Sequence, residues 1–519
     1  MDKPQILWAD DEIDLLKPHI LFLNEKGYEV STATNGNDAI DLISKKRFDI
    51  VFLDENMPGP SGIQTLSKIK SLAPELPVVM VTKSEDEGIM EEAIGSKIAD
   101  YLIKPVNPNQ LLLALKKNLE QRRIITEKTN LNYQQEFRNI GMTLSEKLSA
   151  AQWTDIYRKL VYWELELENI QDKSMYDVLS MQKNEAGLQF SRFVEQNYIK
   201  WLRQHEDNAP LMSHQLFRKK VFPLIESSEV PVFFILIDNL RFDQWKTIQP
   251  FLNDFFNVEE ESTYYSILPT ATQYARNALF AGLMPSEIEK RFPKIWVYDD
   301  DDEGKNQHEE FLLAEQLKMY GKNIPFSYTK ITDFEKGKQL SEMVNQMYRN
   351  KLNAIVYNFV DMLSHARTDM KVIRELAEEE KAYRSITRSW FEHSPLLEAI
   401  KKMSEKPCRI IITTDHGTIR VKEPSKIIGD RNTNTNLRYK QGKNLSYEKK
   451  DVLEIKNPAD AYLPKVNVST TYVFVKHDKF FAYPNNFNYY VNHYRDTFQH
   501  GGISPEEMII PYSVLKSKS

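Results

Sequence analysis

Residues 49–62 read DIVFLDENMPGPSG: a short apolar run ends on an acid, Asp54, and continues into a turn rich in proline and glycine. Similar short runs lie at residues 5–9, 28–33, 77–82 and 100–103, and helical patterns fill the gaps between them. Strands that alternate with helices predict a parallel, doubly wound α/β sheet over residues 1–120. In such a sheet, ligands bind at the carboxyl ends of the strands.

Polar side chains stand at four of these strand ends: Asp10 and Asp11, Asp54, Thr82, and Lys104 beside a proline. Three carboxylates at one edge repel one another unless a cation joins them, and Mg²⁺ prefers oxygen ligands. We therefore predict a Mg²⁺ site in which Asp54 attacks a phosphoryl group and Lys104 neutralises the developing charge. Thr82 is expected to donate a hydrogen bond to the phosphoryl oxygens. The alternative, that each is merely a polar strand end, does not account for the ordered set.

The segments ILWADDE, VFLDENMPG–SG, VVMVT and DYLIKP resemble a flavodoxin-like (βα)5 response-regulator receiver domain. The resemblance implies phosphorylation of Asp54 by a sensor histidine kinase. It also implies direct Mg²⁺ binding by Asp11 and Asp54, binding through water by Asp10, and a ligand from the backbone carbonyl of Asn56. Tyr101 matches the aromatic residue of the output switch, and phosphorylation commonly makes receivers dimerise.

One residue departs from the receiver pattern, because Lys83 follows Thr82 where a small residue is usual. A long cation there affects phosphoryl access or phosphoryl lifetime, and the sequence leaves the choice open. Beyond the receiver, residues 109–209 contain no proline and only two glycines, which predicts a helical linker bundle over residues 121–208.

The bulk composition excludes several classes of protein. The chain has 519 residues, which suggests about three domains, and its net charge of −6 does not fit a protein that coats nucleic acid. The one cysteine, Cys408, allows neither an intrachain disulfide nor a cysteine-based metal site and fits a reducing compartment. The first residues lack the features of a signal peptide, and the apolar run 230–237 is too short to span a bilayer. We therefore expect a cytoplasmic protein.

Residues 209–519 predict a second α/β domain, with buried strands at 232–237, 354–359 and 409–413 and helices at 338–349 and 375–402. Six candidate metal ligands stand at the ends of these strands and in one late glycine-rich loop: Asp238, Asp361, His365, Asp415, His416 and His500. Six ligands suffice for two three-ligand sites. Imidazole and carboxylate without thiolate suit Zn²⁺, with Mn²⁺ as the next candidate.

The segment SILPTATQYARNALFAG offers a nucleophile, because Thr270 and Thr272 both enter a helix. A helix N-terminus favours anions. With the six ligands, this segment resembles the PglZ branch of the alkaline phosphatase superfamily, in which the nucleophile lies about ten residues before a glycine. The resemblance implies Thr272 as nucleophile in a phosphoric ester hydrolase. It also implies two Zn²⁺ ions, one on Asp238, Asp415, His416 and Thr272, the other on Asp361, His365 and His500.

Together, the three segments resemble PorX-type response regulators, a family linked to the type IX secretion system. Residues 420–450, with nine Lys or Arg against three Asp or Glu, are predicted to form an inserted loop. This loop either binds a phosphate backbone, with Tyr439 and Tyr447 stacking on bases, or is a solvated insertion. The first reading favours a phosphodiesterase acting on nucleotides or oligonucleotides. The other readings are a metal-binding platform for a sigma factor or other signalling protein, and a transcriptional regulator.

Overall fold

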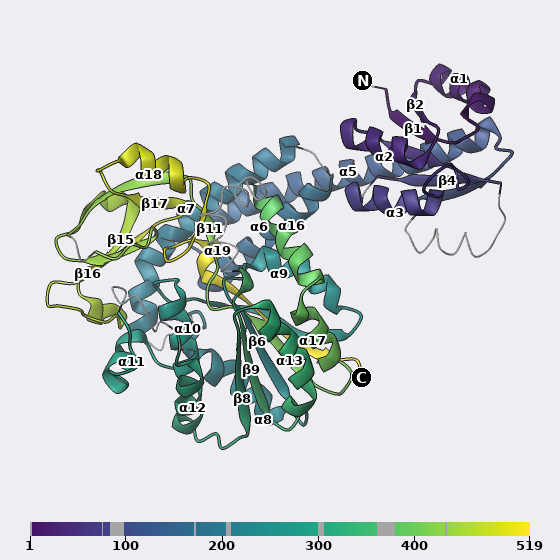
Figure 1. Cartoon of the computed structure of the whole chain (residues 1–519). Coiled ribbons are helices and arrows are strands. Elements are labelled where there is room, and N and C mark those ends of the chain that lie inside the picture. The colour runs from purple at the N-terminus through teal and green to yellow at the C-terminus, as the bar shows by residue number, and fades with distance from the viewer. Residues whose placement is uncertain are drawn as a thin grey trace. The chain divides into compact units, whose positions relative to one another are not determined.

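The computed structural model describes residues 3–74, 76–83, 98–170, 173–203, 209–298, 306–360, 379–430 and 433–519 (Figure 1). The chain forms two compact units, the first comprising Met1–Glu136 with Asn169–Gln171 and the second Phe137–Glu168 with Asp172–Ser519. Among the described residues, no helix is long and apolar enough to cross a membrane.

The first unit contains a parallel five-stranded sheet in the order β2-β1-β3-β4-β5, which confirms the flavodoxin-like prediction. Its strands are β1 (Gln5–Ala9), β2 (Glu29–Ala33), β3 (Ile50–Leu53), β4 (Val78–Thr82) and β5 (Asp100–Ile103). The helical elements described between and after them are η1 (Ile13–Leu16), α1 (Lys17–Glu25), α2 (Gly36–Lys45), α3 (Gly62–Leu72) and the start of α5 (Pro108–Leu144).

Both faces of this sheet are covered, which explains why its strands are apolar throughout. Leu7 and Val51 pack into one core, whereas Trp8 and Phe52 pack into the other. Alternate residues of a strand point to opposite faces, so each strand supplies both cores. Ser61 caps α3 with a reciprocal pair of hydrogen bonds and so fixes the turn that follows Asp54.

Three long helices follow, as the sequence predicts for the linker: the C-terminal part of α5, then α6 (Ala150–Ile170) and α7 (Lys173–Arg203). Aromatic side chains join α6 and α7 to the large sheet of the second unit. Trp153 on α6 contacts Phe190 on α7, and Phe190 contacts Tyr265 at the end of a strand of the main sheet. The last two helices therefore share a core with the second α/β domain.

The second unit is built on a six-stranded sheet in the order β7-β19-β10-β6-β9-β8. Its parallel strands are β6 (Val232–Ile237), β8 (Phe326–Ile331), β9 (Leu352–Tyr357) and β10 (Arg409–Thr413), and the edge is extended by the antiparallel pair β7 (Phe256–Tyr265) and β19 (Ile509–Ser517). All six residues of β6 are buried, each contributing about 1.5–3 kcal/mol through burial.

Helices cover both faces of this sheet. Phe233 and Ile235 of β6 face a core shared with α9 (Phe242–Ile248), α13 (Phe334–Met347), α16 (Glu380–Glu392) and α17 (Pro395–Met403). Phe234, on the other face, contacts Phe217 and Phe280. Those two residues lie on η3 (Phe217–Val221) and α10 (Thr272–Ala281). The remaining helical elements are η2 (Ser213–Gln215), α8 (Phe222–Ser227), η4 (Gln249–Leu252), α11 (Pro285–Arg291) and α12 (Glu309–Met319).

Three small sheets follow β10, in the orders β11-β18, β14-β12-β17 and β13-β16-β15. Their elements are β11 (Ile419–Arg420), β12 (Glu423–Ile428), β13 (Tyr439–Gly442), β14 (Ser446–Tyr447), η5 (Lys449–Asp451), β15 (Val452–Ile455), η6 (Pro458–Ala461), β16 (Thr471–Val475), β17 (Lys479–Ala482), α18 (Phe487–Tyr494), β18 (Phe498–Gln499) and α19 (Pro505–Met508). The prediction of an inserted loop over residues 420–450 is therefore wrong, because strands β11 to β14 lie there.

Candidate functional site

The first candidate site lies at the carboxyl ends of β1, β3 and β5. Ligand atoms of Asp10, Asp11 and Asp54 all lie within 4.8 Å of one another. Lys104 Nζ lies 2.7 Å from a carboxylate oxygen of Asp10 and 3.2 Å from one of Asp54. The structure thus brings together the acids and the cation that the sequence places at separate strand ends.

Burial shapes the electrostatics of this cluster. Asp10 and Asp54 are buried, whereas Asp11 is exposed. Burial raises the pKa of Asp54 to about 6; nearby Lys104 lowers it and the neighbouring carboxylate of Asp10 raises it. A divalent cation among these oxygens would oppose both the burial and the repulsion, so the donor set fits Mg²⁺.

The other predicted receiver residues lie around this edge. Thr82 is fully buried at the end of β4, Tyr101 is half-buried on β5, and Asn56 is exposed in the turn after Asp54. Lys83 pairs with Glu12 across 2.6 Å on the surface. The unusual cation at this position is therefore held by an acid next to Asp11.

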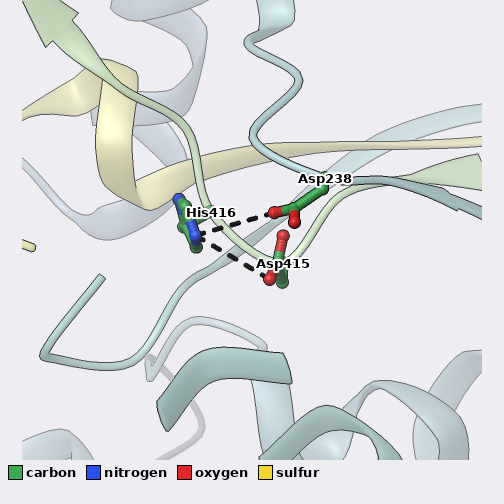
Figure 2. Close-up of side chains that lie close together, drawn as sticks. All are labelled: Asp238, Asp415 and His416. Carbon is green, nitrogen blue, oxygen red and sulfur yellow. Dashed lines mark ion pairs between the residues drawn. The ribbon is translucent and has the colours of Figure 1, made fainter. Parts of the chain in front are cut away.

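The second candidate site lies at the carboxyl ends of two neighbouring parallel strands, β6 and β10. Asp238 follows β6, and Asp415 and His416 follow β10; all three are buried. Figure 2 shows the imidazole facing both carboxylates, with His416 Nε2 3.9 Å from Asp238 Oδ1 and 3.8 Å from Asp415 Oδ2. Ligand atoms around tetrahedral zinc lie about 3.3 Å apart, so a small inward movement would suit a metal ion.

Thr272 is the first residue of α10, and its hydroxyl reaches this cluster. Thr272 Oγ1 lies 3.0 Å from His416 Nε2. Gly282 ends the helix with a φ of +63°, a conformation that glycine adopts without strain. Thr270 has a different position: its hydroxyl donates to the carbonyl of Gly502 and accepts from the N–H of Gly501. Of the two threonines, Thr272 is the one in contact with His416.

Arg276, one helical turn after Thr272, supplies the positive charge of the site. Its guanidinium pairs with Asp238 Oδ2 and lies 3.1 Å from Asp415 Oδ2. Burial opposes ionisation of Asp415, but Arg276 and His416 outweigh it and lower the pKa to about 2. Asp238 therefore offers one oxygen to Arg276 and the other to His416. The sequence analysis missed Arg276, although the spacing of four places it on the same helix face as Thr272.

His500 lies against His416, with ring centroids 4.3 Å apart and planes tilted by 20°. Its Nδ1 lies 3.1 Å from the carbonyl of Thr270, and His416 Nδ1 lies 3.1 Å from the carbonyl of Gly417. Histidines that bind zinc through Nε2 commonly donate from Nδ1 to a carbonyl in this way. Two further predicted ligands of a second site, Asp361 and His365, lie outside the described residues.

A buried ion pair connects the two loops that carry the histidines. Arg438 donates to both carboxylate oxygens of Glu507, at 3.1 and 2.6 Å. Glu507 accepts from the N–H of Gly502 at 2.9 Å, and its carbonyl accepts from the N–H of Gly417 at 3.2 Å. This pair was also missed, since neither residue stands at a strand end of the main sheet.

Fewer basic and aromatic side chains of residues 420–450 are exposed than the sequence predicts. Arg438 and Lys440 are buried, and Tyr439 is buried against Tyr274. Tyr439 is therefore not available to stack on a nucleic acid base. The exposed cations of this stretch are Lys422, Lys426, Lys449 and Lys450 among the residues that the structure describes.

Comparison with protein-family models matches three successive segments. Residues 6–116 match a response regulator receiver domain, residues 123–202 a PorX response regulator linker domain, and residues 216–516 a BREX system PglZ alkaline phosphatase-like domain. The last match covers more than half of the chain.

Curated relatives match about a quarter of the chain. The alginate biosynthesis transcriptional regulatory protein AlgB of Pseudomonas syringae is 37% identical over 120 residues, 23% of this chain and 27% of that protein. The transcriptional regulatory protein ZraR of Klebsiella oxytoca is 35% identical over 123 residues, 24% and 28% of the two chains. The chain thus spans about a quarter of the length of these relatives. A CheY-like receiver domain from Methanospirillum hungatei JF-1 is 28% identical, with a TM-score of 0.23, over 23% of this chain and 95% of that one.

The fold, the strand-end clusters and the three family-model matches define a two-component response regulator that carries an alkaline-phosphatase-like domain. The chain belongs to the PglZ family, and its order of receiver, linker and PglZ domain is that of PorX-type response regulators. The predicted architecture is confirmed.

Proposed function

We propose that the chain is a response regulator in which phosphorylation of Asp54 controls a zinc-dependent phosphodiesterase in the PglZ domain. The observation that carries the enzymatic part is the contact of 3.0 Å between Thr272 Oγ1 and His416 Nε2, beside two buried carboxylates. A hydroxyl at a helix N-terminus next to imidazole and carboxylate ligands suits nucleophilic attack on an anionic phosphate.

Asp238, Asp415 and His416 would hold the first zinc ion with the oxygen of Thr272, and His500 would belong to a second site with Asp361 and His365. Bound zinc would supply Lewis acidity towards the phosphoryl oxygens and would ease loss of the hydroxyl proton. Mn²⁺ is the alternative metal.

Reaction would proceed in two displacements. Thr272 Oγ1 loses its proton and forms a bond to phosphorus, while the bond from phosphorus to the leaving oxygen breaks. Water then attacks phosphorus in this threonine ester, the bond from phosphorus to Oγ1 breaks, and Oγ1 regains a proton. A diester substrate is thus split into an alcohol, released in the first displacement, and a phosphate monoester, released in the second. Arg276 orients Asp238 and Asp415, because its guanidinium contacts both carboxylates, and it favours the ionised form of Asp415.

We further propose nucleotides or oligonucleotides as substrates. The support is the exposed group Lys422, Lys426, Lys449 and Lys450, which can neutralise phosphates although the chain as a whole is acidic. By resemblance to PorX-type regulators, the cognate partner would be a sensor histidine kinase, the phosphorylated form a homodimer, and the pathway the control of type IX secretion.

A second candidate function is a platform that binds a sigma factor or another signalling protein without hydrolysis. One observation favours it: Arg276 already neutralises Asp238 and Asp415, so this core can be held together without a metal ion. The chain would then use the domain for binding alone.

Hydrolysis of bis(p-nitrophenyl) phosphate by the full-length protein, with and without added Zn²⁺, separates the two. The enzyme proposal predicts zinc-dependent turnover that falls at least about 10³-fold in Thr272→Val, with partial activity kept in Thr272→Ser. The monoester p-nitrophenyl phosphate should be the poorer substrate. Absence of turnover of either compound by the zinc-loaded protein would leave the binding platform as the function.

A further inference from the structure

A second cavity lies in the PglZ unit, away from the two histidines. Its volume is about 450 Å³, within the range of about 300–1,000 Å³ usual for small-molecule pockets. It lies among the end of α7, the turns η2 and η3, the end of α10 and residues of α11 and α12. Gly282 lines it, whereas Thr272 stands at the opposite end of α10, about 15 Å away along the helix axis.

Two adjacent cations give this cavity its charge. Arg218 and Lys219 line it, both are exposed, and neither forms an ion pair with any residue that the structure describes. The next residue, Lys220, by contrast pairs with Glu260 at 2.6 Å. The acid in the described wall, Glu287, accepts from the N–H of Met284 at 2.8 Å.

The backbone that presents these cations is unusual. They lie on η3, a π-helical turn, and such turns occur often at functional sites because they alter where side chains project. Phe217, the first residue of this turn, packs its ring against Phe234 of the central strand β6. Its cations therefore project from a rigid support.

Aromatic and polar side chains complete the wall. Trp201, Tyr320 and Tyr462 supply ring surface. Nδ1 of His214 and Oε1 of Gln215 are buried polar atoms without a hydrogen-bond partner among the described residues. Both atoms have almost no accessible surface, so they lie behind the wall, and the polar groups that face a ligand directly are the exposed cations. Burial and the neighbouring cations lower the pKa of His214 to about 4, so the imidazole is neutral near pH 7.

We propose that this cavity is a second, non-catalytic site that binds a nucleoside monophosphate. Arg218 and Lys219 hold the phosphate through charge-assisted hydrogen bonds, for which guanidinium and ammonium donors are well suited. The rings of Trp201, Tyr320 and Tyr462 contact the planar base. This inference is independent of the proposed hydrolysis, because none of these residues belongs to the zinc-ligand set.

Calorimetric titration of the full-length protein with AMP, joined to photolabelling with 8-azido-AMP, tests the proposal. Thr272→Val should bind AMP as wild type does, and the label should map to the peptides that contain Tyr320 or Tyr462. Replacing Arg218 and Lys219 together by alanine should weaken AMP binding at least about tenfold. The matched control, Lys220→Ala, removes the same kind of charge from the same turn and should leave the affinity within about twofold of wild type.

Three results would overturn the proposal. Unchanged AMP affinity in the double variant would show that Arg218 and Lys219 do not bind the phosphate. Label confined to peptides around His416 would show that the nucleotide binds in the other site. Equal affinity for adenosine and AMP, or for inorganic phosphate and AMP, would show that the cavity does not recognise both halves of a nucleotide.

Discussion

The receiver cluster and the PglZ cluster are built on one plan and differ in their donor atoms. In both, acids at the carboxyl ends of parallel strands pair with one cation, the partly buried Lys104 in the first and the fully buried Arg276 in the second. The first cluster offers oxygen donors alone, and its own Asp54 is the candidate nucleophile. The second adds an imidazole, and its candidate nucleophile comes from a separate helix. Position in the sheet thus assembles the acids, whereas the added donor selects the metal and the chemistry.

The two cations also differ in effect. Lys104 faces two carboxylates that remain close to each other, and the pKa of the buried Asp54 stays raised at about 6. The positive charge of Arg276 is shared by the three nitrogen atoms of its guanidinium, and the pKa of the fully buried Asp415 falls to about 2. At Asp415 the imidazole of His416 adds to the effect of Arg276, whereas at Asp54 the neighbouring carboxylate of Asp10 opposes the effect of Lys104.

The largest expected effects come from exchanging one acid in each cluster for its amide. Asp54→Asn should abolish phosphoryl uptake from acetyl phosphate and leave zinc-dependent hydrolysis by the unphosphorylated protein intact. Asp415→Asn should keep phosphoryl uptake and lower hydrolysis at least about 10²-fold, because a neutral amide binds zinc poorly. Both activities are read on the same preparations, and loss of both in either single variant would contradict the independence of the two clusters.

Arg276→Met tests whether the cation holds the second cluster together. Two buried carboxylates would lose their partner, so the free energy of unfolding of the metal-free protein should fall by about 3–5 kcal/mol. Added Zn²⁺ should then raise the thermal midpoint by more than it does in wild type. Arg409→Met, which breaks the partly exposed pair with Glu259, is the control and should cost less than about 1 kcal/mol. An equal loss in the two variants would count against the account.

Glu507→Gln is the next test, because it removes the charge that pairs with buried Arg438. The free energy of local opening around His416 and His500 should fall by about 2 kcal/mol. Amide hydrogen exchange in β10 measures it, and amides of β1 in the receiver serve as the internal control. Faster exchange in β1 as well would show a general loss of structure instead of a local one.

The last test concerns Lys440, a buried cation that, unlike Lys104 and Arg276, has no carboxylate partner among the described residues. Burial lowers its pKa to about 7, although its ammonium donates to the carbonyl of Asn434 at 2.7 Å. Between pH 7 and about 10 the unfolded chain binds the extra proton, so wild-type stability rises with pH through this range.

Lys440→Met should therefore stabilise the protein at pH 7, and this gain should disappear towards pH 10. Denaturant unfolding of both forms at several pH values measures the difference. A gain that stays constant with pH would mean that the lysine is already paired or solvated.

The strand-end residues could be predicted from sequence because each follows a buried apolar run, and parallel strands bring their ends to one edge. Asp10, Asp54 and Lys104 meet for this reason, as do Asp238 and Asp415. The antiparallel strands β7 and β19 were not predicted, since β7 is largely polar and β19 contains a proline. Their pairing joins residues about 250 positions apart, and a local sequence pattern cannot predict such a distant pairing.

Two other features could not be predicted from the sequence, for physical reasons. Arg276 looks like an ordinary helical cation until its helix is placed above the acids. The stretch 420–450 looks like a solvated loop because it is rich in lysine and asparagine, yet Arg438 and Lys440 are buried through a paired acid and a backbone carbonyl. Tertiary contacts, and not composition, decide where such cations lie.

The central claim is that Asp238, Asp415 and His416 share a zinc ion within reach of the Thr272 hydroxyl. A crystal structure of the zinc-loaded protein, with anomalous difference maps recorded on both sides of the zinc absorption edge, tests it directly. The account predicts a peak about 2 Å from His416 Nε2 and from one oxygen of each carboxylate. A map without a peak there, with the guanidinium of Arg276 still filling the space between the two acids, would contradict it.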